Sequence, residues 1–185
     1  AKLGIEDPVN FIDSYVEKLY KLIIYIPESH LDQVREAISK AGAGHIGNYS
    51  DCTFYTVGTG TFRPLEGTNP FIGEQNLLEK VAEYRLESIV PESLLKSVVD
   101  AAKSAHPYEE VAYDLYQLQL DGKKYGLGKL GMLKKDMDFE SFIKHVKDKL
   151  NIGHLRSIGR PKNKIKKVAV FCGSFGLKVE HLVNN

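Results

Sequence analysis

The sequence contains few cysteines, almost no net charge and no long apolar run. Its two cysteines, Cys52 and Cys172, lie far apart, and no signal peptide is visible at the N-terminus. Lysine and arginine number 25 against 24 for aspartate and glutamate, so no overall charge favours nucleic acid or a membrane surface as the partner. No apolar run reaches the length of a membrane span. These absences predict a soluble, cytoplasmic protein.

Motifs that hold metals or phosphates are also missing. The histidines are scattered, without H-x-x-x-H or C-x-x-C spacing, so no residue is predicted to bind a metal. A glycine turn at 173–176 follows an apolar run but lacks the lysine and spacing of a P-loop. The basic run 162–167 has no interleaved aromatic residues and reads as a solvated turn. Spacing alone assembles no nucleophile with a histidine base, so no catalytic residue is predicted.

A strand-and-helix unit occurs twice in the chain. KLIIYIPESHLDQVREAISKAG begins at Lys21, and AEYRLESIVPESLLKSVVDAAKSAH begins at Ala82. Each has an alternating run typical of a strand, then Pro-Glu-Ser, then an amphipathic helix. Proline ends the strand because it has no N–H to donate, and the serine is predicted to cap the helix. The apolar positions of the two helices are Leu31, Val34, Ile38 and Ala41, and Leu94, Val98, Ala102 and Ala105.

Two further strands complete the repeat. Residues 53–62 are rich in β-branched and aromatic residues, which is typical of a strand. Residues 111–119, which follow the second helix, are also interpreted as a strand. The resulting order is strand, helix, strand, strand, helix, strand. That order predicts an α+β fold, a ferredoxin-like βαββαβ domain over residues 19–120.

The flanking segments have a different character. Residues 1–18 form a polar lead-in from a preceding half, with a turn or short helix expected at Asp7-Pro8. Residues 121–131 resemble a hairpin, and a helix capped by Asp138 is expected to end near Gly153. Its apolar side comprises Phe139, Phe142, Ile143, Val146 and Leu150. The run 168–172 is interpreted as a buried parallel strand, so residues 121–185 are predicted to be an incomplete α/β segment.

Three loop segments carry the polar residues of interest. GAGHIGNYSDC (42–52) and HPYEE (106–110) each follow a helix of the repeat, and FRPLEGTNPFIGE (62–74) is longer than a hairpin needs. Glycine turns and helix capping explain the first two without a ligand. Equally, a subunit contact made by the apolar residues of 62–74 explains the third. The candidate donors and acceptors for a small polar ligand or a cation between subunits are His45, Asn48, Tyr49, Arg63, Glu66, Glu74, His106 and Glu109.

These segments together resemble a known family. The stretches 21–52, GTGTFRPLEGTNPFIGE and AHPYEEVAYDLYQL are similar to the middle, insert domain of the NGG-interacting-factor-three family. That domain is similar in fold to the trimeric PII and CutA proteins. GLGKLGML, FESFIKHVKDKL and KKVAVFCGSFG resemble the start of the family's C-terminal half, so the resemblance covers nearly the whole chain.

The resemblance implies a hexameric, two-metal protein for full-length members, some of which are called homologues of a second type of GTP cyclohydrolase I. The family's ligands come from a histidine-rich N-terminal motif and a C-terminal histidine and glutamate. No histidine here lies in a matching motif, so no cofactor is expected in this chain. The histidines are His30, His45, His106, His145, His154 and His181.

Two hypotheses follow from the resemblance. The first is a fragment whose insert domain assembles the protein as a trimer or hexamer and regulates a metal-dependent, hydrolase-like core. The second is a non-enzymatic module of the PII or CutA type that binds a small molecule or divalent cation, or a protein-interaction module. Neither hypothesis involves nucleic acid or a membrane.

Overall fold

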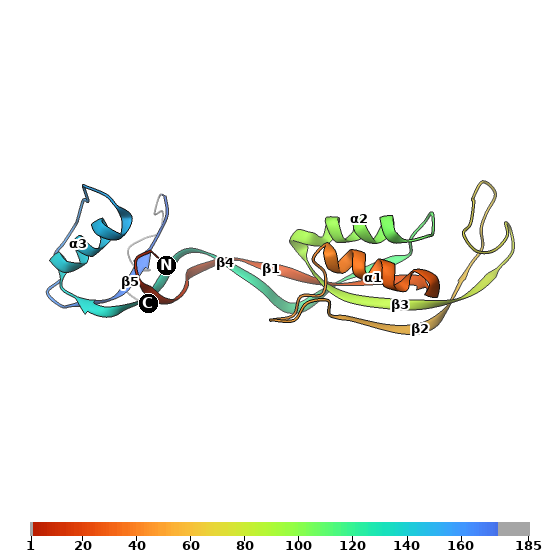
Figure 1. The fold of residues 1–185 in the computed structure, drawn as a ribbon, viewed down its shortest axis with the longest axis horizontal. Coiled ribbons are helices and arrows are strands. Elements are labelled where there is room, and N and C mark those ends of the chain that lie inside the picture. Colours follow the sequence, from red (N-terminus) through yellow and green to blue (C-terminus); the bar gives the residue numbers. More distant parts are fainter. Residues whose placement is uncertain (1, 174–185) are drawn as a thin grey trace. The chain divides into compact units, whose positions relative to one another are not determined.

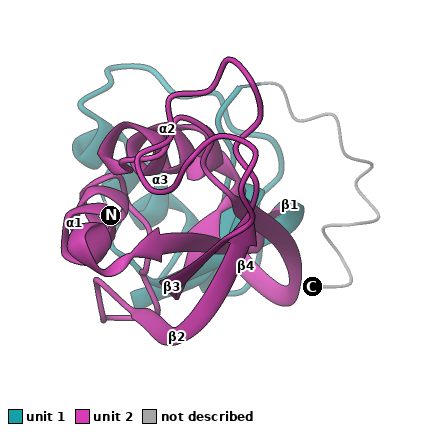
Figure 2. Ribbon diagram, turned by 90° about the vertical axis from the view of Figure 1, so that its right-hand side faces the viewer, with its two compact units in different colours: residues 1–15, 124–185 teal, residues 16–123 magenta. Residues whose placement is uncertain are grey.

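The computed structural model describes residues 2–173, which form two compact units (Figure 2). One unit comprises residues 1–15 and 124–185, and the other comprises residues 16–123. Strands β1 (Ile5–Pro27) and β4 (Tyr113–Met137) contribute to both. Residues 174–176 of the predicted glycine turn, and His181, lie outside the described residues.

The unit of residues 16–123 is an antiparallel sheet with two helices on one side (Figure 1). After β1 come a short 3-10 turn (Glu28–His30) and helix α1 (Leu31–Lys40). Strands β2 (Thr53–Phe62) and β3 (Glu79–Pro91) follow, and then a second 3-10 turn (Glu92–Leu94), helix α2 (Leu95–Ala105) and β4. The strands lie in the order β2-β3-β1-β4, and β3 is antiparallel to both β1 and β2. The α+β class predicted from the sequence is confirmed.

The core of this unit fills the space between the sheet and its helices. Leu22, Ile24 and Ile26 of β1 are almost fully buried and point to the same side because they alternate along the strand. Val34 of α1 and Val98 of α2 meet them, each fully buried. Burial of such aliphatic side chains stabilises the fold by about 1.5–3 kcal/mol each. The alternating and helical periods of the repeat therefore identify its core.

The serines of the repeated Pro-Glu-Ser do not cap the helices as expected. Neither 3-10 turn nor the helix behind it has a side-chain cap. The Ser29 hydroxyl lies 2.9 Å from Nδ1 of His30, whereas the Ser93 hydroxyl donates to the buried carboxylate of Glu17. Glu17 also accepts from the backbone N–H of Ser93, at 3.3 Å. The cap of the second helical segment is thus supplied by β1, a contact distant in sequence.

The other unit differs from its prediction in three places. Residues 5–15 belong to β1 rather than to a turn or helix, and β4 runs straight through the expected hairpin at 121–131. Strand β5 (Ile165–Val170) pairs with β4 antiparallel, so the expected parallel strand is wrong. Antiparallel pairing needs no crossover helix, which explains how so short a segment extends the sheet.

Helix α3 (Phe139–Leu150) of this unit follows its prediction closely. The Asp138 carboxylate accepts the backbone N–H of Ser141 at 2.8 Å, which satisfies one of the unpaired donors of the first turn. The helix ends at Asn151, whose left-handed φ of 54° takes the role expected of Gly153. Within residues 2–173, no helix is long and apolar enough to span a membrane.

Candidate functional site

The connection between β2 and β3 is an ordered loop over residues 63–78. Arg63 donates through Nη1 to the carbonyl oxygen of Asn76 at 2.7 Å, and the Asn76 N–H donates to the Pro64 carbonyl, also at 2.7 Å. The Thr68 carbonyl accepts from the Gln75 amide at 2.8 Å. These bonds close the two arms of the loop on each other. The loop is therefore a fixed wall, and its Arg63 is engaged in holding the loop closed.

The segment after α2 is held in place by one buried histidine. Nε2 of His106 lies 2.9 Å from the carbonyl oxygen of Tyr25, and the backbone N–H of Tyr108 donates to Nδ1 at 3.1 Å. Burial lowers the pKa of His106 below its ordinary value of 6.5. The hydrogen bond to Tyr25 acts in the opposite direction, and the charge of His30 lowers the pKa further. His106 anchors the turn of residues 106–110 to β1.

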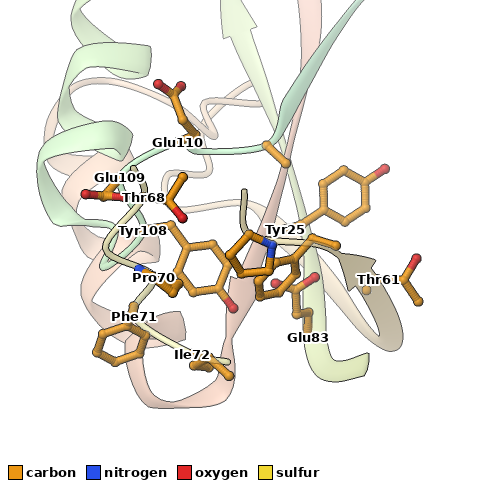
Figure 3. A pocket seen from close by; sticks show the side chains of 14 residues that line it. Tyr25, Thr61, Thr68, Pro70, Phe71, Ile72, Glu83, Tyr108, Glu109 and Glu110 are labelled. Atoms are coloured by element: carbon orange, nitrogen blue, oxygen red, sulfur yellow. The ribbon is translucent and has the colours of Figure 1, made fainter. Parts of the chain in front are cut away.

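An open cavity of about 390 Å³ lies between the two segments (Figure 3). The ends of β1 and β2 and the start of β3 form its floor, the 63–78 loop forms one wall and residues 108–112 form the other. The apolar and aromatic lining side chains are Tyr25, Phe62, Pro64, Pro70, Phe71, Ile72, Tyr108 and Ala112. Such a concave, mostly apolar surface with few polar groups is typical of small-molecule sites.

Tyr108 is the central side chain of this cavity. Its ring contacts those of Phe62, Phe71 and His106, with centroids 6.0, 6.1 and 4.9 Å away. Its hydroxyl oxygen is buried and lacks a hydrogen bond of normal length and angle within the described residues. Burial, followed by the negative charge and hydrogen-bonding capacity of Glu83, raises the pKa of Tyr108 above its ordinary value. A polar atom in this state is unusual in a folded protein and favours a ligand or water partner.

Of the residues predicted from the sequence, Glu109 lines this cavity, and His106, Arg63, Glu66 and Glu74 belong to the two segments that form its walls. The Glu109 carboxylate accepts the backbone N–H of Asn69 at 3.1 Å, so the loop and the 106–110 turn are joined directly. His106 and Glu109 therefore both hold the 106–110 turn in place, the first against β1 and the second against the loop. Glu74 donates its backbone N–H to Glu79, and Glu66 is exposed on the loop.

The other predicted residues lie elsewhere in the chain. His45, Asn48 and Tyr49 are exposed on a turn closed by paired backbone hydrogen bonds between Ile46 and Tyr49. This turn is attached beside Ile89, through the N–H of Gly44 at 2.8 Å, whereas the cavity adjoins the start of β3. Within one chain the two groups are separate. Their meeting across a subunit boundary stays a prediction.

The residues present do not fit the metal pair that the resemblance implies for full-length members. Within residues 2–173, no group of three or more histidine, cysteine, aspartate or glutamate side chains is placed to hold a metal ion. The three carboxylates beside the cavity, Glu83, Glu109 and Glu110, form no such group.

Sequence reasoning missed Tyr25, Glu83 and Tyr108. Tyr25 and Glu83 looked like ordinary alternating positions of two strands that are far apart in the sequence. Their proximity depends on the pairing of Pro27 with Glu83, which local patterns do not specify. For Tyr108 a signal existed, because a tyrosine between His106 and Glu109 stands in the same short motif.

Comparison with known proteins places the chain in a family. Residues 12–184 match the family model described as Duf34/NIF3 (NGG1p interacting factor 3). A "GTP cyclohydrolase 1 type 2 homolog" of Halalkalibacterium halodurans is 49% identical over 97% of this chain and 48% of its own length. A protein of the same name from Bacillus subtilis is 45% identical over 91% of this chain and 45% of its own length. The chain thus spans about half the length of the curated relatives it matches.

A solved structure agrees with this assignment. The crystal structure of a Bacillus cereus protein related to NIF3 matches with a TM-score of 0.81 and 42% identity. The match covers 97% of this chain and 47% of the other. On the family match and these identities, the chain belongs to the Duf34/NIF3 (NGG1p interacting factor 3) family.

Proposed function

We propose that residues 16–123 form a ferredoxin-like module of the PII and CutA type whose main role is to assemble a longer NIF3-family protein. The strand order β2-β3-β1-β4, with both helices on one side, supports this assignment. The observation that carries the assembly role is the second face of the sheet. No helix of residues 16–123 covers that face (Figure 1).

The uncovered face has the composition of an association surface. Phe54 of β2, which is 65% exposed, lies on it beside Glu87 of β3, whereas Ile23 of β1 on the same face is already buried within the chain. On β4, the Asp114 carboxylate accepts a hydrogen bond from the Tyr25 hydroxyl at 3.2 Å, so Asp114 lies on this face. Tyr116, two residues further along the strand, lies on the same face and is 56% exposed. Exposed aromatic side chains on an open sheet face favour burial against another copy.

Three charged side chains of this face, Lys21, Arg85 and Glu87, are paired within the chain. The Glu87 carboxylate forms ion pairs with Nζ of Lys21 at 3.5 Å and with Nη1 of Arg85 at 2.5 Å. Burial of the face therefore leaves no unpaired charge at this cluster, which removes one cost of association. We infer a trimer, or a dimer of trimers, built on the open faces.

The oligomeric mass of the unmodified chain tests this proposal. Light scattering at about 50 µM should give a mass above that of a monomer, and Phe54→Asp should lower it. Val57→Asp is the matched control, because Val57 is 63% exposed on the same strand but lies on the opposite face. A monomeric unmodified chain, or equal effects of the two substitutions, would contradict the proposal.

For the longer protein we propose a metal-dependent, hydrolase-like core that this module assembles and regulates. The name of the relatives, "GTP cyclohydrolase 1 type 2 homolog", supports the hydrolase-like part of this proposal, and their greater length leaves room for a core outside this chain. Metal content and nucleotide turnover of a full-length relative, with and without residues equivalent to 16–123, test the proposal. Unchanged assembly and activity without the module would contradict it.

A second function is a small-molecule binding module. The observation that favours it is the buried hydroxyl of Tyr108, which lacks a hydrogen bond of normal length and angle in an apolar cavity. A ligand at this position would fill the cavity and satisfy the hydroxyl. A thermal-shift screen of the unmodified chain against Tyr108→Phe tests it, since a ligand bound through the hydroxyl should stabilise only the former.

A further inference from the structure

We propose that the cavity between the 63–78 loop and the 106–112 segment binds an organic cation: an ammonium or guanidinium group carried on a small apolar or aromatic body. This inference rests on the second function proposed above and names its ligand class. It is independent of the assembly role, which uses the other residues of the open sheet face.

The charge of the cavity is the first argument. Among the described residues that line it, every charged side chain is a carboxylate, namely Glu83, Glu109 and Glu110. The arginine of the loop, Arg63, donates to the Asn76 carbonyl and is not among the lining residues. An anionic ligand would meet only like charge here, so a phosphate or carboxylate ligand is disfavoured.

The polar atoms that remain available are the second argument. The buried Tyr108 hydroxyl has no hydrogen bond of normal length and angle within the described residues, and it points toward the Glu83 carboxylate (Figure 3). The Tyr25 hydroxyl is already used as a donor to Asp114. The Glu83 carboxylate and the Tyr108 hydroxyl place oxygen acceptors side by side in the cavity. An ammonium group carries only N–H donors, so it is complementary to these acceptors.

The walls supply the third argument. The ring centroids of Tyr108 and Phe71 are 6.1 Å apart, and those of Tyr108 and Phe62 are 6.0 Å apart. Aromatic faces attract a nearby cation by about 0.5–2 kcal/mol, more when the cation is desolvated. Pro64, Pro70 and Ile72 line the rest of the cavity and suit an apolar body.

The geometry separates this ligand class from a bare metal ion. A divalent metal needs several converging oxygen or nitrogen ligands, and the residues that the structure describes offer no cluster of three such groups. One carboxylate near several rings is sufficient for an organic cation, because the rings replace part of its hydration.

Three probes of nearly equal shape test the inference on the unmodified chain. They are 2-phenylethylamine, a cation at pH 7, 2-phenylethanol, its neutral counterpart, and phenylacetate, an anion. Ligand-observed NMR titration should give a dissociation constant for the amine at least about 10-fold lower than for the alcohol, and no binding of phenylacetate. Equal binding of all three would leave a ligand cavity but overturn the cation class. Binding of none would overturn both this inference and the second function.

Substitutions then locate the cation. Glu83→Gln and Tyr108→Phe should each weaken amine binding, the former by at least about 10-fold because it removes the charge. The control is Glu36→Gln, on the exposed side of α1, where the carboxylate pairs with Lys40 at 3.1 Å. Amine binding unaffected by Glu83→Gln would overturn the site. If Glu83→Gln does not fold, the comparison of the three probes on the unmodified chain still decides the inference.

Discussion

His106 is held as a neutral imidazole between two backbone groups of different elements. The Tyr108 N–H can only donate, so Nδ1 accepts at 3.1 Å, and the Tyr25 carbonyl can only accept, so Nε2 carries the proton at 2.9 Å. The histidine therefore joins the end of α2 to β1 and fixes the wall that carries Tyr108. It serves the cavity by positioning, without facing a ligand itself.

Replacement of His106 should therefore reduce stability markedly. His106→Ala removes two partly buried hydrogen bonds and leaves both backbone partners unpaired, at a cost of about 2–4 kcal/mol in the free energy of unfolding. Urea unfolding at pH 7.5 measures it. His154→Ala, at an exposed position, is the control and should change the free energy by less than about 0.5 kcal/mol. Equal effects of the two substitutions would contradict the anchoring role.

The same histidine should make stability depend on pH. Because the pKa of His106 is lowered in the folded chain, the unfolded chain takes up the proton first as the pH falls. The stabilisation is complete above the unfolded pKa of about 6.5 and is lost as the pH falls through the lower, folded value. Thermal unfolding at pH 7.5 and pH 5.0 should show a larger loss for the unmodified chain than for His106→Gln. A loss of the same size in both would show that other groups are responsible.

The contact of Glu17 with Ser93 gives a third prediction. Ser93→Ala removes a hydrogen bond to a buried carboxylate at the start of the second helical segment and should destabilise the chain by about 1–3 kcal/mol. Ser29→Ala is a matched control from the first copy of the repeat, because the hydroxyl of the exposed Ser29 bonds its half-buried neighbour His30 and not a buried carboxylate. Its expected effect is below about 0.5 kcal/mol in the same urea titration. Equal effects would mean that the two copies are capped alike.

These cases show what local sequence patterns can and cannot predict. The period of Leu22, Ile24 and Ile26 depends only on burial of one strand face, and it was predicted correctly. The cap at Ser93 depends on Glu17, which is distant in the sequence, so a local rule chose the wrong partner. Tyr25 and Glu83 were missed for the same reason, because strand pairing alone brings them to the cavity.

The glycines of β4 explain why a hairpin was predicted at 121–131. A side chain at Gly122 would clash with the backbone carbonyl of Glu17, and one at Gly126 would clash with that of Ile12. Glycine inside a strand thus allows a neighbouring backbone to approach closely. The same residue type marks turns, and the sequence alone does not separate the two uses.

Metal content gives a fourth prediction. The chain of 185 residues, purified without chelators and dialysed, should contain no near-stoichiometric zinc, iron or manganese and should not turn over GTP, because the family's ligand motifs are absent from its sequence. Elemental analysis and a GTP assay with added divalent metal check this. Stoichiometric metal after dialysis, or metal-dependent turnover, would contradict it. A full-length relative prepared in parallel is the positive control.

The last prediction concerns the glycine turn after α1. Gly44 has a φ of +78°, and a Cβ there would lie 2.8 Å from the backbone nitrogen of Cys52 and 2.9 Å from its oxygen. Gly47 has a φ of +58° with open space around it. Gly47→Ala should therefore cost only the left-handed backbone penalty, about 1–2 kcal/mol. Gly44→Ala adds a backbone clash and should cost clearly more, because the bonds of Gly44 to Ile89 and Cys52 must also shift.

Comparison of the two alanine variants by urea unfolding tests this argument. A larger loss for Gly44→Ala would mean that this glycine of GAGHIGNYSDC is required for the close approach of the turn to Cys52, with no ligand needed to explain it. Equal losses would remove the steric explanation. Gly44 would then need another reason, and a role of the turn with His45, Asn48 and Tyr49 between subunits would be the hypothesis to pursue.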